Sequence, residues 1–223
     1  MQSIYHVKSG ELFGYEVLAR IRDGKRFMAA GQFIEVAERL GLAPKIDQII
    51  LTKGLRIREE KGWWDKRFFF NLSTNSLFGG EYIDLIRSHY ERNPEASENT
   101  GVTIEILERE AIHNVNGLME IIEAMKKVGI TFALDDFGSG FSSFVYLKYF
   151  DTDFVKIDGE FVKNIAVNEK DRIFVKHINQ IAQEFGKQTI AEYVEDKETL
   201  DILKEIGVDY AQGYHYGRPQ LLE

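Results

Sequence analysis

Apolar segments of two kinds alternate along the chain. Short runs rich in β-branched and aromatic residues predict buried strands. We expect these strands at residues 12–18, 68–72, 102–107, 130–135, 153–158, 188–192 and 208–212. Between them, apolar residues recur at helical spacing, which indicates helix faces packed on a core. The two clearest stripes are Leu118, Ile121, Ile122 and Met125, and Phe174, Ile178, Ile181 and Phe185. Strands that alternate with helices predict a parallel sheet.

Glycines mark the ends of several helical segments. Gly41, Gly129, Gly186 and Gly207 each follow a helical stretch and precede the next apolar run. A glycine in this place is typical of a helix C-terminal cap, because it accepts the left-handed backbone that ends the helix. The pattern supports a repeated strand-helix unit.

Size and composition narrow the class of protein. A chain of 223 residues with 44% hydrophobic residues can bury one sizeable core, and α/β barrels of this length are often single domains. The absence of cysteine excludes disulfides, thiolate zinc sites and cysteine nucleophiles. The apolar runs are too short to span a membrane and the amino terminus lacks a signal-peptide pattern, so we expect a cytoplasmic domain without membrane contact. The net charge of -8 argues against a general nucleic-acid surface.

Polar and ionisable residues stand where the predicted strands end. They are Glu16, Asn71, Glu105, Asp135, Asp136, Lys156, Asp158, Glu192 and Gln212. In an α/β barrel the carboxyl ends of the strands meet on one face, where active sites lie. The sequence therefore predicts a convergent acidic cluster. The alternative, that the segment 135–138 is only a turn, remains open for that segment taken by itself.

Such a cluster needs compensation. Two carboxylates about 4 Å apart repel by roughly 4 kcal/mol at an effective dielectric constant near 20, whereas a whole domain is stable by only about 5–15 kcal/mol. Protonation relieves one or two carboxylates, and bound divalent cations relieve all of them. Ligands that are all oxygen favour magnesium or manganese over zinc or copper.

These residues stand within motifs whose order resembles that of a known family. The motifs are Tyr15-Glu16-Val17-Leu18-Ala19-Arg20, Asn71-Leu72-Ser73, Glu105-Ile106-Leu107-Glu108, the segment 135–143, Lys156-Ile157-Asp158, Ala191-Glu192-Tyr193-Val194-Glu195 and Gln212-Gly213-Tyr214. In this order, and over almost the whole chain, they resemble the EAL-domain family of cyclic dimeric GMP phosphodiesterases. Gln2-Ser3-Ile4 resembles the family's opening strand.

The resemblance implies a TIM-type (β/α)8 barrel whose first strand is antiparallel. It implies hydrolysis of cyclic di-GMP to linear pGpG with two Mg²⁺ or Mn²⁺ ions, and we expect Ca²⁺ to inhibit, since its looser coordination supports binding better than turnover. By analogy the first ion is held by Glu16, Asn71, Glu105 and Asp135. The second is held or oriented by Asp135, Asp136 and Asp158. Asn71 taken alone is equally explained as a turn or cap residue.

The remaining roles also follow from the resemblance. Glu192 is our choice of general base, with a water oriented by Lys156 and Asp158 as the alternative. An ion pair between Lys156 and Asp158 without a catalytic role is a further alternative. The expected substrate contacts are Gln2, Leu18, Arg20 and Gln212. The expected loop anchors, or residues behind the direct ligands, are Glu108, Glu195 and Ser139. Arg20 and Glu195 are also explained as surface residues.

Three functions stay in view at this level. The first is an active phosphodiesterase. The second is a catalytically silent cyclic di-GMP receptor that signals through a partner, and the third is an unrelated barrel hydrolase of another phosphate ester. The resemblance also implies a homodimer with its contact near 144–150, although this run is equally explained as interior packing. We expect residues 1–223 to form a single domain cut from a longer protein with sensory or other signalling domains.

Overall fold

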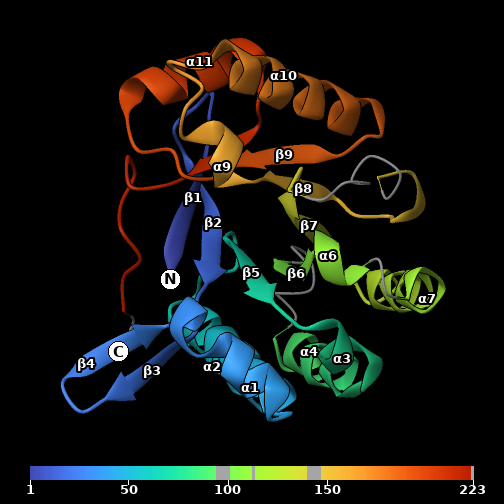
Figure 1. Ribbon diagram of the computed structural model, residues 1–223. Coiled ribbons are helices and arrows are strands. Elements are labelled where there is room, and N and C mark those ends of the chain that lie inside the picture. Colours follow the sequence, from blue (N-terminus) through green and yellow to red (C-terminus); the bar gives the residue numbers. More distant parts are fainter. Residues whose placement is uncertain (94–100, 112–113, 140–146, 222–223) are drawn as a thin grey trace.

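The computed structural model describes residues 1–93, 101–111, 114–139 and 147–221. Eight strands close into a barrel in the order β1-β10-β9-β8-β7-β6-β5-β2 (Figure 1). The barrel strands are β1 (Gln2–His6), β2 (Leu12–Val17), β5 (Arg67–Asn71), β6 (Val102–Leu107), β7 (Thr131–Phe137), β8 (Phe154–Ile157), β9 (Gln188–Ala191) and β10 (Tyr210–Gln212). The expected (β/α)8 barrel is confirmed.

The first strand runs against its neighbours. β1 pairs antiparallel with both β2 and β10, and the other neighbouring pairs around the barrel are parallel. Gln2 lies opposite Glu16, and Ile4 lies opposite both Gly14 and Gln212. The antiparallel first strand implied by the resemblance is therefore confirmed. Its reversal places the start of β1 beside the carboxyl ends of β2 and β10.

Helices surround the barrel, and a separate hairpin extends from it (Figure 1). The helices are α1 (Ile34–Arg39), α2 (Ala43–Glu60), α3 (Thr74–Phe78), α4 (Glu81–Arg92), α6 (Glu108–Ala111), α7 (Val115–Lys126), α9 (Gly159–Val162), α10 (Glu169–Glu184) and α11 (Lys197–Ile206), with a 3-10 turn η1 (Ala30–Gln32) before α1. The hairpin consists of β3 (Arg20–Asp23) and β4 (Arg26–Ala29). Within the described residues, no helix combines the length and apolar character that a membrane crossing needs.

The predicted helix ends agree with the structure. Gly41, Gly129, Gly186 and Gly207 follow α1, α7, α10 and α11 with φ angles of 66°, 84°, 71° and 87°. These angles are left-handed, where a side chain is disfavoured and glycine is not. One predicted core residue is wrong: Phe185 lies just beyond the end of α10 and is 48% exposed. The helical stripe stops at Ile181 because the chain turns away before the next repeat.

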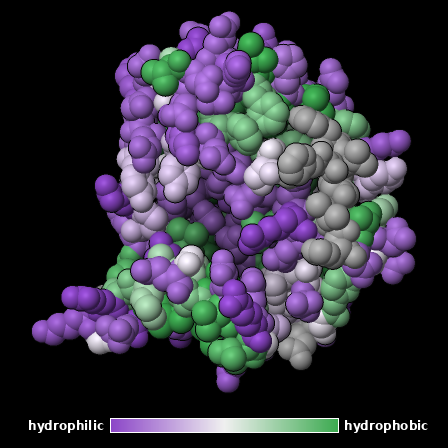
Figure 2. Space-filling model, viewed as in Figure 1, coloured by the Kyte–Doolittle hydropathy of each residue, from purple (hydrophilic) through white to green (hydrophobic). Residues whose placement is uncertain are grey.

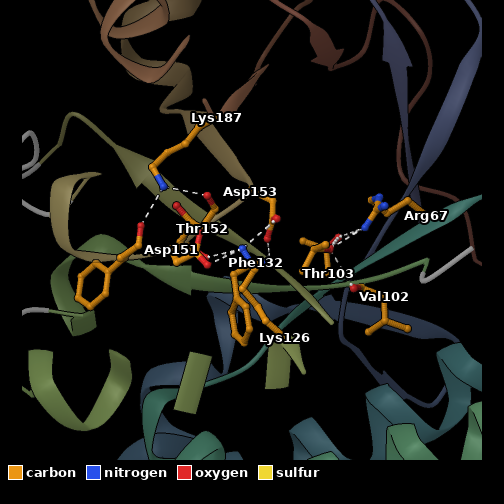
Figure 3. Close-up of polar contacts among 11 residues, drawn as sticks. Arg67, Val102, Thr103, Lys126, Phe132, Asp151, Thr152, Asp153 and Lys187 are labelled. Carbon is orange, nitrogen blue, oxygen red and sulfur yellow. Dashed lines mark hydrogen bonds and ion pairs between the residues drawn. The ribbon is translucent and has the colours of Figure 1, made fainter. Parts of the chain in front are cut away.

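The amino-terminal ends of the parallel strands form a sealed floor. Inside the barrel Ile4, Phe69, Ala133, Phe154, Ile190 and Tyr210 pack together with Phe13. The guanidinium of Arg67 lies 5.8 Å from the Phe13 ring centre and 5.3 Å from that of Phe154. It also donates to the Thr103 hydroxyl at 3.2 Å (Figure 3) and to the Thr131 hydroxyl at 2.6 Å. Aromatic packing and hydrogen bonds thus close this end of the barrel.

The buried Lys187 and the partly buried Lys126 lie at the same end of the barrel (Figure 3). Lys187 donates to the carbonyl oxygens of Phe150 and Thr152, at 2.8 Å each. Lys126 makes ion pairs with Asp151 at 2.9 Å and Asp153 at 3.2 Å. The expected dimer segment 144–150 borders this region. Residues 144–146 of that segment are outside the described residues, and in the remainder Leu147 and Phe150 are buried while Tyr149 is 47% exposed. Interior packing therefore accounts for two of these residues.

Tryptophans also pack at this end. Trp63 stacks on Tyr15 with ring centres 5.0 Å apart, and Trp64 lies 5.3 Å from the guanidinium of Arg58. Both rings are partly buried against the core between the barrel and its helices. A site for catalysis is therefore expected at the opposite end of the barrel, where the parallel strands have their carboxyl ends.

Candidate active site

Four carboxylates surround one lysine where the parallel strands end. The ammonium nitrogen of Lys156 lies 3.0 Å from a Glu105 oxygen, 3.0 Å from Asp135, 2.9 Å from Glu192 and 3.7 Å from Glu16. Lys156 and Glu105 are each only 1% exposed. Residues far apart in sequence are brought together because β2, β6, β7, β8 and β9 deliver them to the same end of the barrel. The predicted convergence of these acids is therefore present.

Glu16 links this cluster to a row of amides. It accepts hydrogen bonds from Asn71 Nδ2 at 2.9 Å and from Gln212 Nε2 at 2.5 Å. The same Gln212 nitrogen lies 3.1 Å from Gln2 Oε1, across the antiparallel β1-β10 pair. Gln2, Asn71 and Gln212 thus border the carboxylates with neutral groups that add no further repulsion.

The electrostatics of the cluster depend on burial and on Lys156. Burial would lower the pKa of Lys156, but the surrounding carboxylates raise it well above its ordinary value, so the ammonium stays charged. Burial would raise the pKa of Glu16, yet Lys156 and the hydrogen bonds from Gln212 and Asn71 lower it. Burial raises the pKa of Glu105 well above normal, with Glu16 and Asp135 adding to the effect of burial against the attraction of Lys156.

Two further acids, Glu192 and Asp136, have pKa values raised toward neutral pH. Burial raises the pKa of Glu192 to about 8 against the opposing charge of Lys156. Burial, then the charges of Asp135 and Asp158, raises the pKa of Asp136 to about 6. A raised pKa makes the ionised carboxylate a stronger base, and the group accepts a proton only in that ionised form.

One group of acids is spaced to share a cation. Oxygens of Asp135, Asp136 and Glu192 lie within 4.8 Å of one another. Among the described residues, Glu105 Oε2 is a buried oxygen with no hydrogen-bond partner, and burying a carboxylate oxygen without one is costly. An all-oxygen donor set with an unsatisfied buried oxygen fits magnesium or manganese. Glu192, expected as a base away from the ligands, belongs by distance to the same group as Asp135 and Asp136.

The strand that carries the paired aspartates is irregular at this point. Asp136 has a φ of 53°, and the pairing of β7 with β8 shifts register between Leu134 and Phe137. The backbone nitrogen of Gly138 donates to Glu108 Oε2 at 3.1 Å, and Ser139 Oγ donates to the Asp136 carbonyl at 2.8 Å. Glu108 and Ser139 are thus placed to support the loop after β7, whose residues 140–143 are outside the described residues.

Asp158 does not pair with Lys156. Its Oδ1 accepts a hydrogen bond at 2.8 Å from the backbone nitrogen of Glu160 and caps α9. The four carboxylates that do pair with Lys156 come from other strands or strand ends. The alternative of a simple ion pair between Lys156 and Asp158 is therefore wrong. Asp158 still acts on Asp136 through its charge.

Two cavities open on either side of Glu16 and Leu18. One, of 250 Å³, is lined by Gln2, Arg20, Glu192, Glu195, Gln212 and other residues. The other, of 370 Å³, reaches Asn71, Glu105, Asp135 and Asp136 and extends under α1 and α2. Figure 2 shows a hollow near the position of β2 and β5 in Figure 1, lined mainly by hydrophilic residues. Arg20 donates to its neighbour's carbonyl, Ala19 O, at 2.8 Å, and contributes to the cavity wall.

Sequence reasoning missed two aromatic residues in the first cavity. Tyr193 and Tyr214 line it, with exposed fractions of 60% and 46%. Both stand inside the motifs, directly or two residues after Glu192 and Gln212. An aromatic residue that follows a polar strand end is the signal that could have identified them.

The fold and the site define a class of protein: an eight-stranded barrel with one reversed strand and a buried carboxylate-lysine cluster at its open end. The family model described as EAL domain matches residues 1–219, and the chain belongs to this family. The resemblance seen in the motifs is confirmed.

Several known proteins are similar to this chain. It is 44% identical over 211 residues to cyclic di-GMP phosphodiesterase PdeB of Shewanella oneidensis, covering 93% of this chain and 24% of that protein. It is 34% identical to probable cyclic di-GMP phosphodiesterase PdeA of Escherichia coli, covering 96% of this chain and 29% of the relative. The chain thus spans about a quarter of the length of these curated relatives. Among solved structures, the PaMucR phosphodiesterase in complex with c-di-GMP matches with a TM-score of 0.88 and 27% identity, over 98% of this chain and 90% of that one.

Proposed function

We propose that this domain is a metal-dependent phosphodiesterase that hydrolyses cyclic di-GMP to linear pGpG and so lowers the level of this second messenger. The observation that carries the proposal is the convergence of Glu16, Glu105, Asp135 and Glu192 on Lys156 at the open end of the barrel. The 44% identity to a cyclic di-GMP phosphodiesterase supports the same reaction. No position that the resemblance implies as a ligand is replaced in this chain.

The cation sites follow from the oxygen ligands. Glu16, Asn71, Glu105 and Asp135 would hold one Mg²⁺ or Mn²⁺ ion. Asp135 and Asp136 would hold the second, with Asp158 orienting this side through its charge and Glu192 within reach. When bound, two such ions would offset the negative charge of the scissile phosphate and would supply the Lewis acidity that activates a water molecule.

The protein's own groups complete the reaction. Glu192 would accept a proton from the attacking water, because its carboxylate has an oxygen within 4.8 Å of those of Asp135 and Asp136, the proposed ligands of the second ion. Lys156, kept charged by its carboxylate neighbours, orients that water or neutralises a phosphate oxygen. The new bond joins the water oxygen to phosphorus while the bond from phosphorus to the ribose 3′ oxygen breaks. That oxygen takes up a proton from solvent while Glu192 releases to solvent the proton that it accepted, and the product is linear pGpG.

The shape of the site suits a ligand with two nucleotides. The two cavities share Glu16 and Leu18, so a phosphodiester placed there has room for a nucleotide on each side. Gln2, Leu18, Arg20 and Gln212, which line the first cavity, would contact the substrate, and the planar fork of Arg20 suits a phosphate. Glu195 lies on the wall of the first cavity. We further propose that the domain works in the cytoplasm, as a homodimer and as part of a longer signalling protein.

Product analysis tests the function. The purified chain is incubated with cyclic di-GMP and Mg²⁺, Mn²⁺, Ca²⁺ or a chelator, and pGpG is quantified by chromatography. We expect product with Mg²⁺ or Mn²⁺, binding with little product in Ca²⁺, and none with chelator. Asp135→Asn, which nearly preserves side-chain shape and removes the charge, should abolish product, whereas the exposed control Asp201→Asn should not.

Two results would overturn the proposal in different ways. Binding of cyclic di-GMP without product under Mg²⁺ and Mn²⁺ would identify the silent receptor. Neither binding nor product would point to the unrelated hydrolase. Undiminished turnover by Asp135→Asn would refute the cation assignment while leaving the substrate in place.

A further inference from the structure

Backbone strain occurs next to the acidic cluster. Among the described residues, the non-glycine residues with positive φ are Asp136 at 53° and Tyr193 at 56°. Each directly follows a carboxylate that pairs with Lys156, namely Asp135 and Glu192. The left-handed region is unfavourable for a bulky side chain, and such strain persists where the surrounding structure imposes it, often at ligand sites. The conformation of Asp136 serves the cluster itself, which leaves that of Tyr193 without an assigned purpose.

The strained turn is firmly held. The backbone nitrogen of Val194 donates to the Gln212 carbonyl at 3.0 Å, and that of His215 donates to the Val194 carbonyl at 2.9 Å. Gly213 lies so close to the Val194 backbone that an added Cβ would be 2.2 Å from its carbonyl oxygen. The segments after β9 and β10 are thus fixed to each other, and Tyr193 is carried on a rigid support.

The ring of Tyr193 is supported on one side and open on the other. A Cβ added to Gly159 would be 2.3 Å from Tyr193 Cδ2, so the ring packs directly on that glycine. Tyr193 is nevertheless 60% exposed and lines the cavity that contains Gln2, Arg20 and Tyr214. Because the ring of Tyr193 gains so little burial, packing alone does not account for the strained backbone at this residue. Its open surface borders the space beside the proposed scissile phosphate.

We propose that Tyr193 is a substrate-binding residue whose ring stacks on one guanine base of cyclic di-GMP. The inference rests on the proposed function and deepens it. A base that extends from a phosphodiester near Glu16 into the first cavity passes the wall that Tyr193 forms. Aromatic stacking needs only a flat exposed ring at a fixed position, and every base offers a π face. The strain of residue 193 is the cost of holding that ring in place.

Substitutions at this position separate stacking from structural support. Tyr193→Gly removes the ring and keeps the left-handed backbone, because glycine adopts it without strain. Tyr193→Phe keeps the ring and removes the hydroxyl. Phe185→Leu is the control, since Phe185 is a 48% exposed aromatic residue just beyond the end of α10, away from the first cavity.

The measurements are Kd for cyclic di-GMP in Ca²⁺ by calorimetry, KM and kcat with Mn²⁺, and the melting temperature. For Tyr193→Gly we expect Kd and KM to rise about tenfold, equivalent to about 1.4 kcal/mol, with kcat changed less than about twofold. Tyr193→Phe and Phe185→Leu should keep Kd within about twofold. The melting temperature of Tyr193→Gly should stay within about 3 °C of wild type, which a purely structural role for the ring would not allow.

The outcomes distinguish the two proposals. Wild-type turnover with unchanged or tighter binding by Tyr193→Gly would overturn the stacking role and leave the phosphodiesterase intact. Weaker binding by Tyr193→Phe equal to that of Tyr193→Gly would replace stacking with a hydroxyl contact and also overturn it. No binding by the wild-type chain would overturn the proposed function and the guanine contact together.

Discussion

Replacing Lys156 with methionine removes the positive charge from the centre of the carboxylate cluster. Among the described residues, Lys156 is the only lysine or arginine that makes an ion pair with Glu16, Glu105, Asp135 or Glu192. Methionine is similar in length and unbranched, so the change is mainly one of charge. The carboxylates are left close together without a cation, and the folded state becomes less stable.

The magnitude follows from the burial of the group. Lys156 is 1% exposed, with three carboxylate oxygens at 2.9–3.0 Å. Removing one partner of a buried ion pair costs about 3–5 kcal/mol. For a chain of this size 1 kcal/mol shifts the melting temperature by about 2–4 °C, so Lys156→Met should melt roughly 6–20 °C below wild type in chelator. A divalent cation that binds the folded state restores stability by mass action, and the more negative cluster gains more from it.

The assay is thermal unfolding followed by circular dichroism, in chelator and with increasing Mn²⁺. The matched control is Lys187→Met, because Lys187 is similarly buried but donates to the carbonyl oxygens of Phe150 and Thr152 at the opposite end of the barrel. We expect both variants to melt early and Mn²⁺ to raise the melting temperature most for Lys156→Met. Equal responses of the two variants to Mn²⁺, or a wild-type melting temperature for Lys156→Met in chelator, would refute the electrostatic account.

Three further predictions concern stability and loop support. Burial, with a nearby arginine, lowers the pKa of His89 to about 4, so the unfolded chain binds this proton more readily than the folded chain. The free energy of unfolding should be highest above about pH 6.5 and should fall by at most about 3 kcal/mol as the pH drops toward 4. Urea unfolding of His89→Gln should then show a flatter pH profile than that of wild type. Gly54→Ala places a Cβ 2.4 Å from Phe70 Cε1 in the core, and overpacking should cost about 1–3 kcal/mol in the same urea assay, whereas a neutral effect would mean that the ring can move aside. Glu108→Ala removes the acceptor of the Gly138 nitrogen and should lower kcat by about 10–100-fold, less than loss of a cluster carboxylate; an equal loss would make Glu108 a direct ligand.

Much of the fold and the general location of the site follow from local sequence patterns. Buried strand segments carry β-branched and aromatic residues, and the parallel order of strands obliges their carboxyl ends to meet. For this reason Glu16, Glu105 and Asp135 could be placed together before their distances were known. Strand limits were less precise: β10 begins at Tyr210 instead of residue 208, because the Val208 nitrogen bonds to Leu203 in the cap of α11.

The pairing of charged groups could not be predicted in the same way. Sequence proximity suggested Asp158 as the partner of Lys156, two residues away. In the structure Asp158 instead caps α9, and the partners of Lys156 come from around the barrel. A local hydrogen bond to the helix start holds Asp158, whereas the position of Lys156 inside the barrel exposes it to carboxylates distant in sequence. These ion pairs depend on closure of the barrel, so the local sequence around Lys156 does not predict them.

The paired aspartates show why the site needs a break in regular structure. Side chains of neighbouring residues in a regular strand point to opposite faces, so Asp135 and Asp136 would not both face the barrel mouth. The positive φ of Asp136 and the register shift between Leu134 and Phe137 interrupt that alternation. Both carboxylates can then join Glu192 in one group of oxygens within 4.8 Å. The residues at the strand ends thus predict the composition of the cluster. Its geometry comes from a local irregularity in β7 that the strand pattern alone would not predict.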